Sequence, residues 1–79
     1  MEKPKIGQRW VYHRHDGEPM AVEEVCEYSS RYNTYKVKVI KIEKSTYHQI
    51  GQIFEENYSQ FNSKYFRLMS GQDAPLEIN

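Results

Sequence analysis

The chain has 79 residues, 38% of them hydrophobic and 14% aromatic, and its 11 basic and 11 acidic side chains cancel to a formal net charge of zero. This length allows one small domain without a second core, and the zero charge argues against a protein that grips nucleic acid mainly through phosphates. With one cysteine, Cys26, and no apolar run long enough for a membrane span or a signal peptide, the sequence predicts a cytoplasmic protein without an internal disulfide.

The first predicted element is a strand at residues 8–15, in which Trp10 and Tyr12 fall on one face. An Asp-Gly turn at residues 16–19 ends this strand, because the pair readily adopts positive φ and the following proline interrupts pairing.

Residues 20–28 fit both a helix and a strand. Val22 and Val25 would share a helical face, whereas a strand needs a bulge, because Val25 interrupts the alternation. We favour a strand, since residues 34–44 form the clearest strand in the chain and need a partner. A change of phase near residues 39–40 indicates a second bulge in this hairpin. The hairpin would set acidic side chains opposite basic ones, namely Glu23, Glu24 and Glu27 opposite Lys36 and Lys38.

The second half of the chain is predicted to hold a loop, a fourth strand, a short helical turn and a last strand. The fourth strand spans residues 50–56, and Asn57 is a suitable N-cap for the helical turn. The last strand lies at residues 65–69. We expect a single domain at residues 1–70 and a flexible tail at residues 71–79.

The tripeptide Ile-Gly-Gln occurs twice, at residues 6–8 and 50–52, and an aromatic residue follows each copy, Trp10 and Phe54. Glycine adopts positive φ without steric strain. The two copies therefore predict two strand starts built in the same way. Each isoleucine and the aromatic residue after it are expected to fold over the turn and seal one end of a small barrel.

This order of elements resembles that of small SH3-like β-barrel proteins of bacteria and phages. The resemblance covers residues 5–69 and lies in Gly-x-x-Trp, a long central hairpin, Gly-x-x-Phe, a helical turn rich in Tyr and Phe, and a last strand. It implies a mainly β chain folded as a small five-stranded SH3-like barrel with a short helical turn before the last strand. It also implies a binding function without catalytic residues. The expected core residues are Trp10, Val37, Val39, Ile53, Phe54, Phe61 and Phe66.

Side chains that carry chemistry do not form a recognisable catalytic motif. Adjacent residues of a strand point to opposite faces, so neither Glu23–Glu24 nor Glu55–Glu56 should converge on one substrate atom. Cys26 is expected to be a small core residue. We therefore predict a non-enzymatic protein without cofactors. The residues that could in principle join in a metal site are His13, His15, His48 and Cys26, although ordinary surface histidines are the favoured interpretation and no metal is predicted.

The seven tyrosines exceed what so small a core can bury, and tyrosine is enriched in protein interfaces. The sequence therefore predicts a small interaction module that binds a protein partner through a tyrosine-bearing surface; a regulatory or inhibitory role and a phage origin follow from the resemblance alone. The predicted partner-binding residues are Tyr32, Tyr35, Tyr47, Arg31, Lys36 and Lys38. Two alternatives stay open: single-stranded nucleic acid binding by the Arg31–Lys44 hairpin, and a homo-oligomer paired through strand edges.

Overall fold

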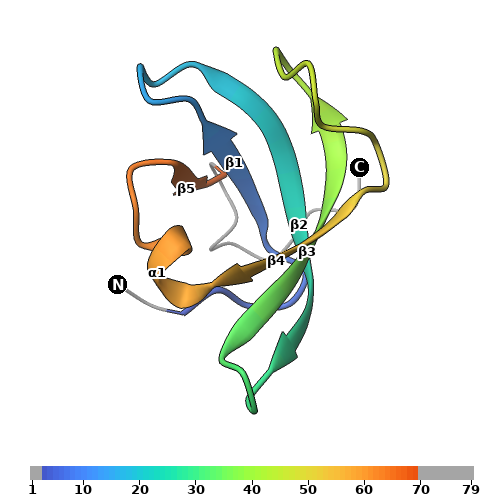
Figure 1. Cartoon of the computed structure of the whole chain (residues 1–79), viewed down its shortest axis with the longest axis vertical. Coiled ribbons are helices and arrows are strands. Elements are labelled where there is room, and N and C mark those ends of the chain that lie inside the picture. Colours follow the sequence, from blue (N-terminus) through green and yellow to red (C-terminus); the bar gives the residue numbers. More distant parts are fainter. Residues whose placement is uncertain (1–2, 70–79) are drawn as a thin grey trace.

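Alternating polar and apolar residues build one curved antiparallel sheet from five strands in the computed structural model, which describes residues 3–69. The elements are β1 (Arg9–His13), β2 (Pro19–Ser29), β3 (Thr34–Ile42), β4 (Ile53–Asn57), α1 (Tyr58–Phe61) and β5 (Phe66–Leu68). The strand order is β4-β3-β2-β1-β5, so the first four strands form a meander and β5 lies beside β1 (Figure 1). The tail predicted at residues 71–79 lies outside the described residues.

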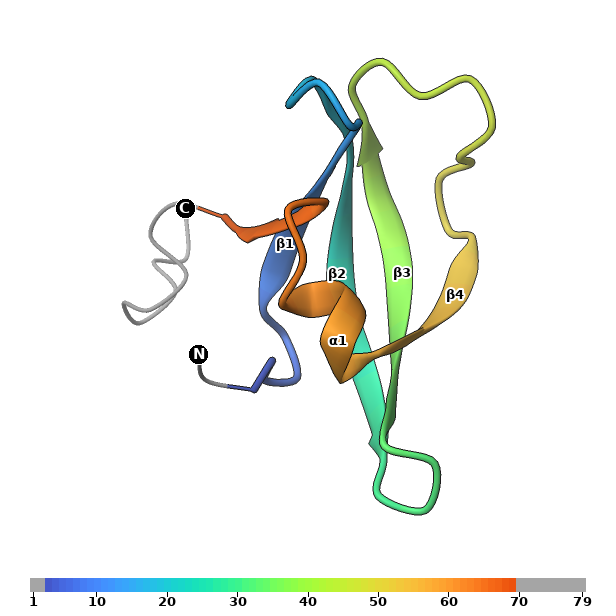
Figure 2. The same ribbon diagram turned by 60° about the vertical axis from the view of Figure 1, so that its left-hand side comes forward.

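The mainly β class, the five strands and the short helix before the last strand confirm the prediction from the sequence, and residues 20–28 belong to strand β2. The closed barrel is not confirmed. Within residues 3–69 the pairing ends at β4 on one edge and at β5 on the other, so the sheet is open. The segment that links these two edges contains α1, which lies in front of the sheet (Figure 2).

Two bulges in the β2–β3 hairpin decide which side chains face the concave side of the sheet. Val22 pairs with Lys41 and Glu23 with Val39, so Ile40 is the extra residue at the position where the sequence indicates a bulge. A second shift leaves Cys26 as the extra residue between Val25 and Glu27.

The two Ile-Gly-Gln copies form matching turns. Gly7 and Gly51 have φ values of +91° and +86°. The Gly7 N–H donates to the Val25 carbonyl at 2.8 Å, and the Gly51 N–H donates to the Val39 carbonyl at 2.7 Å. The two turns thus dock on neighbouring strands with the same geometry.

The isoleucines of these turns do not seal an end of the sheet. Ile6 and Ile50 are 67% and 64% exposed. Each isoleucine precedes a glycine of positive φ at the tip of a turn, a position that projects into solvent.

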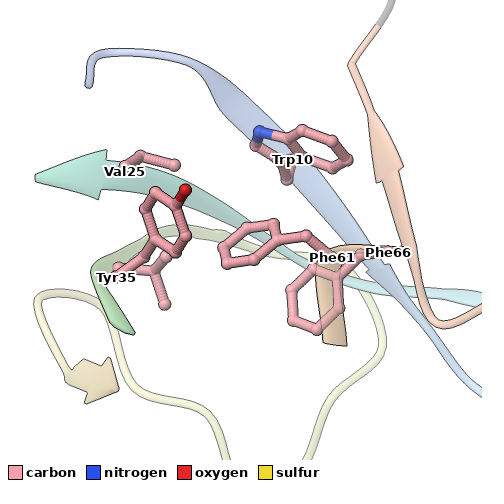
Figure 3. Packing of buried hydrophobic residues seen from close by; sticks show 6 residues of the cluster. Trp10, Val25, Tyr35, Phe61 and Phe66 are labelled. Carbon is pink, nitrogen blue, oxygen red and sulfur yellow. The ribbon is translucent and has the colours of Figure 1, made fainter. Parts of the chain in front are cut away.

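The core is an aromatic cluster on the concave face, centred on Phe61 of α1 (Figure 3). Its ring meets Trp10 edge-on at a centroid distance of 5.2 Å and Tyr35 edge-on at 5.3 Å. Phe66 packs against it at 5.0 Å. Asn57 caps the helix that carries Phe61, since its Oδ1 accepts the Gln60 N–H at 3.1 Å and its own N–H donates to Gln60 Oε1 at 2.7 Å.

Two side chains lie on different sides of the sheet from those expected. Ile53 was expected in the core and is 51% exposed, because the neighbouring Phe54 takes the inward position on β4 and packs partly against the cluster. Tyr35 was expected on the surface and is 2% exposed, because it shares the inward face of β3 with Val37 and Val39. The other expected core residues are buried, namely Trp10, Val37, Val39, Phe61 and Phe66.

Candidate functional site

A pocket of about 360 Å³ lies beside the Phe61 cluster and shares Phe66 with it. This volume falls in the range of small-ligand sites. The pocket is lined by Tyr12, Glu23, Tyr47, His48, Phe54, Glu56, Gln60, Ser63, Tyr65 and Phe66. Strands β1, β2, β4 and β5, the β3–β4 loop, and α1 with the segment after it all contribute to this lining.

Aromatic rings form most of the pocket wall. Tyr12 is the central one: its ring lies 5.4 Å from His48, 5.5 Å from Phe66 and 6.5 Å from Tyr65, and it is stacked on Tyr65. The His48 ring also meets Phe54 edge-on at 5.4 Å. Alternation brings Tyr12 and Phe54 to the concave face, because Tyr12 lies two positions from the buried Trp10 on β1 and Phe54 lies two positions from Glu56, which lines the same pocket, on β4.

Two glutamates are the acidic side chains of the pocket. Glu23 of β2 is 2% exposed and is the buried charged residue of the described chain. Its Oε1 has no hydrogen-bond partner within residues 3–69, and neither does the buried Oε2 of Glu56 on β4. A buried carboxylate without a partner is costly, so these two oxygens are the unusual feature of the site.

Burial raises the pKa of Glu23 to about 7, and the negative charge of Glu56 adds to this effect. Burial also raises the pKa of Glu56. Each carboxyl thus resists ionisation, because its charged form loses water and gains no described hydrogen bond at the free oxygen.

His48 faces Glu23 with its Nε2 at 3.8 Å from Glu23 Oε2. Its other ring nitrogen, Nδ1, shares a hydrogen bond with Ser45 Oγ, and the His48 N–H donates to the same oxygen at 3.0 Å. Ser45 therefore fixes the ring in the β3–β4 loop. Burial lowers the pKa of His48, so at neutral pH the imidazole does not supply the positive charge that would balance Glu23.

The lining offers weak support for nucleophilic chemistry. Ser63 Oγ donates to the Gln60 carbonyl at 2.6 Å and accepts the Tyr65 N–H at 3.2 Å, so its proton is already held by the backbone. The lining combines buried carboxyl groups with aromatic walls, a composition typical of binding sites.

The predicted partner-binding residues are not brought together. Tyr47 is 73% exposed at the rim of the pocket, whereas Tyr32 is 65% exposed at the β2–β3 turn. These two loops lie at opposite ends of the molecule (Figure 1). Arg31 packs over the ring of Tyr32, with its Cζ 5.2 Å from the centroid, and Tyr35 lies in the core.

The lysines of β3 project from the other face of the sheet and have acidic neighbours. Lys36 Nζ lies 3.7 Å from Glu27, and Lys38 pairs in register with Glu24. This agrees with the cross-strand charge pairing expected for the hairpin. Glu23 departs from that expectation, because it faces the concave side opposite Val39.

The histidines considered for metal binding have different surroundings. His13 Nδ1 is 3.1 Å from the Val11 carbonyl, His15 is exposed, and His48 faces the pocket. Among residues 3–69, no group of three or more His, Cys, Asp or Glu side chains is arranged to hold a metal ion. Cys26 is half-buried at its bulge, with Sγ 3.4 Å from the Glu24 carbonyl.

That Glu23 and Glu56 line the same pocket was not predicted from the sequence. The adjacent pairs Glu23–Glu24 and Glu55–Glu56 were correctly expected to diverge, but one member of each faces the concave side. A signal was present in the sequence: Glu23 is in phase with Val25, and Glu56 is in phase with Phe54.

Among the described residues, no helix has the length and apolar character needed to cross a bilayer. Comparison with known proteins finds no matching family model, no similar curated protein and no similar solved structure.

Proposed function

We propose that this chain is a non-enzymatic interaction module that binds a protein partner through the face containing the pocket. One observation carries the proposal: Glu23, a carboxyl 2% exposed and lacking a partner for Oε1, lies at the base of an aromatic pocket. A fold of this size gains little from such a group, because hydrophobic residues of the same volume are usually at least as stabilising as a buried charge. Residues that break a stability rule in this way tend to belong to functional sites.

The surface around the pocket has the composition of an interface. Tyr47 is 73% exposed and Tyr65 38% exposed at the rim, and Ile50 in the same loop as Tyr47 is 64% exposed. Tyrosines dominate the energetics of many protein interfaces, because they bury a large ring and keep a polar tip. The proposed tyrosine-bearing surface is thus the one formed by Tyr12, Tyr47 and Tyr65.

We extend the proposal to the SH3-like barrel. The meander of four strands, the placement of β5 beside β1 and the short helix before β5 support it. In this view α1 and the residues after it span the gap between the edge strands in place of direct pairing. The regulatory or inhibitory role implied by the resemblance to SH3-like proteins of phages belongs to the same proposal.

Binding of single-stranded nucleic acid by the Arg31–Lys44 hairpin has less support. Its lysines have acidic neighbours, as shown by Lys36 beside Glu27 and by Lys41, whose Nζ lies 2.9 Å from Glu43. Charge that is already paired contributes less to phosphate binding.

The experiment is affinity capture from a host lysate treated with nuclease, using the parent chain, Tyr47→Ala and Tyr32→Ala. Both tyrosines are exposed, so neither truncation should disturb folding. We expect a specific protein to be recovered with the parent and with Tyr32→Ala but not with Tyr47→Ala.

The opposite pattern, loss of recovery with Tyr32→Ala alone, would move the interface to the β2–β3 turn. Recovery that depends on the absence of nuclease would favour the nucleic acid alternative.

A further inference from the structure

We propose that the group which enters the pocket is an organic cation on an alkyl stem, the side chain of a lysine or arginine of the partner protein. This inference rests on the proposed function and names the chemistry of its site.

The two carboxyl groups are the first argument, because a bound cation would favour their charged form and so offset the effect of burial on their ionisation. Glu23 Oε1 and Glu56 Oε2 are both buried and have no hydrogen-bond partner within residues 3–69. They come from β2 and β4, on either side of β3, and both side chains line the same cavity. A positively charged donor satisfies two such acceptors at once and gains most where water is excluded. An ammonium has three donors and a guanidinium five, enough for both oxygens.

The aromatic walls are the second argument. A cation within about 6 Å of a ring centroid is attracted to the face of that ring, and tyrosine is among the best acceptors. Tyr12, Tyr47 and Tyr65 line the same cavity as the carboxyls, together with Phe54 and Phe66. The apolar rings would contact the alkyl stem while the charged nitrogen reaches Glu23. A neutral apolar ligand would use the walls and leave the carboxyls unsatisfied.

The charged and titratable groups around the pocket leave this position to a ligand. Tyr12 on β1, the two glutamates on β2 and β4, and Tyr47 in the β3–β4 loop carry no positive charge. His48 is uncharged at neutral pH for the reason given above. Two cations of the described chain lie near the lining tyrosines: Arg14, whose charge interacts with Tyr47 and which pairs with Asp16 at 2.7 Å, and Lys64, whose Nζ lies 5.4 Å from the Tyr65 ring centroid. The Tyr65 ring thus already receives a cation in this structure.

The test uses the full chain at neutral pH and nuclear magnetic resonance titration with n-butylammonium, n-butylguanidinium, n-butanol and butyrate. We expect saturable shifts of the backbone amides of Glu23, His48 and Glu56 with the two cations. Butanol and butyrate should bind at least about tenfold more weakly, because neither ligand offers a positive charge that can pair with the carboxyls. The relative affinity of the two cations separates a lysine site from an arginine site.

Three variants accompany the titration. Glu56→Gln and Glu23→Gln should each weaken butylammonium binding at least about tenfold, and Glu56→Gln remains informative if Glu23→Gln does not fold. Glu27→Gln is the matched control, since its carboxyl is exposed beside Lys36 on the hairpin, and should bind like the parent. Lys64→Gln should bind at least as well as the parent. Equal binding of butanol and butylammonium, or unchanged binding by both pocket variants, would overturn the inference.

The two proposals can fail separately. If the captured protein stays bound in excess butylammonium and also binds Glu56→Gln, the interaction module stands and the cation inference is wrong. If butylammonium binds as described but Tyr47→Ala and the parent capture the same proteins, the cation site stands and the protein-binding proposal fails.

Discussion

Glu23 and His48 face each other at the base of the pocket, with Oε2 and Nε2 3.8 Å apart. This separation would suit an ion pair, but burial disfavours the charged form of both groups. It raises the pKa of Glu23 to about 7 and lowers the pKa of His48. The imidazole is therefore neutral at neutral pH, and the carboxyl keeps its proton through the mildly acidic range.

The stability of the protein should fall as pH rises from about 4.5 to about 7 because of Glu23. In this range the unfolded chain releases the proton of Glu23, whose ordinary pKa is 4.5, while the folded chain retains it. The unfolded state then binds fewer protons, so the free energy of unfolding decreases with pH. Between about pH 4 and pH 8 the parent should lose on the order of 2–3 kcal/mol more than Glu23→Gln in urea unfolding.

Glu27→Gln is the control for this measurement, because the Glu27 side chain is 69% exposed. Its stability curve should run parallel to that of the parent. A constant difference between Glu23→Gln and the parent at every pH would show that Glu23 ionises normally in the folded state.

Replacing Gly7 or Gly51 by alanine should each lower the free energy of unfolding by about 1–2 kcal/mol. An added Cβ would meet no atom within 4 Å at either position, so the loss comes from the positive φ and not from a clash. Asparagine tolerates this conformation better and should lose less. Urea unfolding of the four single variants gives the comparison, and alanine variants as stable as the parent would contradict the assigned turn geometry.

Truncating Phe61 should remove most of the stability of the fold. Its side chain is fully buried and meets both Trp10 and Tyr35 edge-on, and Phe→Ala in a core typically costs about 3–5 kcal/mol. This equals the whole stability expected of so small a domain. Near-ultraviolet circular dichroism of Phe61→Ala should therefore show no fixed aromatic packing.

Phe61→Leu retains most of the apolar volume and should fold with a loss of about 1–3 kcal/mol, because the two edge-on contacts disappear. Near-parent stability of Phe61→Ala would place the centre of the core elsewhere.

The capping box of α1 should contribute about 1 kcal/mol. Asn57→Ala removes the side-chain acceptor for the Gln60 N–H, whereas the backbone N–H of residue 57 can still donate to Gln60 Oε1. Asn57→Ser keeps an acceptor and should restore most of the loss in thermal unfolding. Equal destabilisation by alanine and serine would assign the effect to β4 and not to the helix cap.

The elements governed by local chemistry were predictable from the sequence. Asn57 predicts the start of the helix, and Gly7 and Gly51 predict the two turns. The change of phase near residues 39–40 predicts the bulge in β3. These features depend on residues within a few positions of each other, so periodicity and turn chemistry are sufficient.

The features that depend on distant residues were not predictable in the same way. Sheet closure depends on how far β4 and β5 approach across the concave face, which no local pattern encodes. The pocket required the joint knowledge that Glu23 and Glu56 point to the same side from strands separated by β3. Tyr35 is a different case, since its alternation with Val37 and Val39 already indicated the inward face of β3, and the surface assignment disregarded that phase.

The concave face has two neighbouring regions, the Phe61 cluster and the pocket, with different roles. Aromatic packing around Phe61 holds the sheet together, whereas Tyr47, Gln60 and Ser63 line a cavity without belonging to that cluster. Gln60 also belongs to the capping box and Ser63 to the turn after α1, so Tyr47, which is 73% exposed, is the position where a substitution can alter what the cavity accepts without dismantling the architecture. Divergent copies of this chain would be free to exchange specificity while keeping a common scaffold.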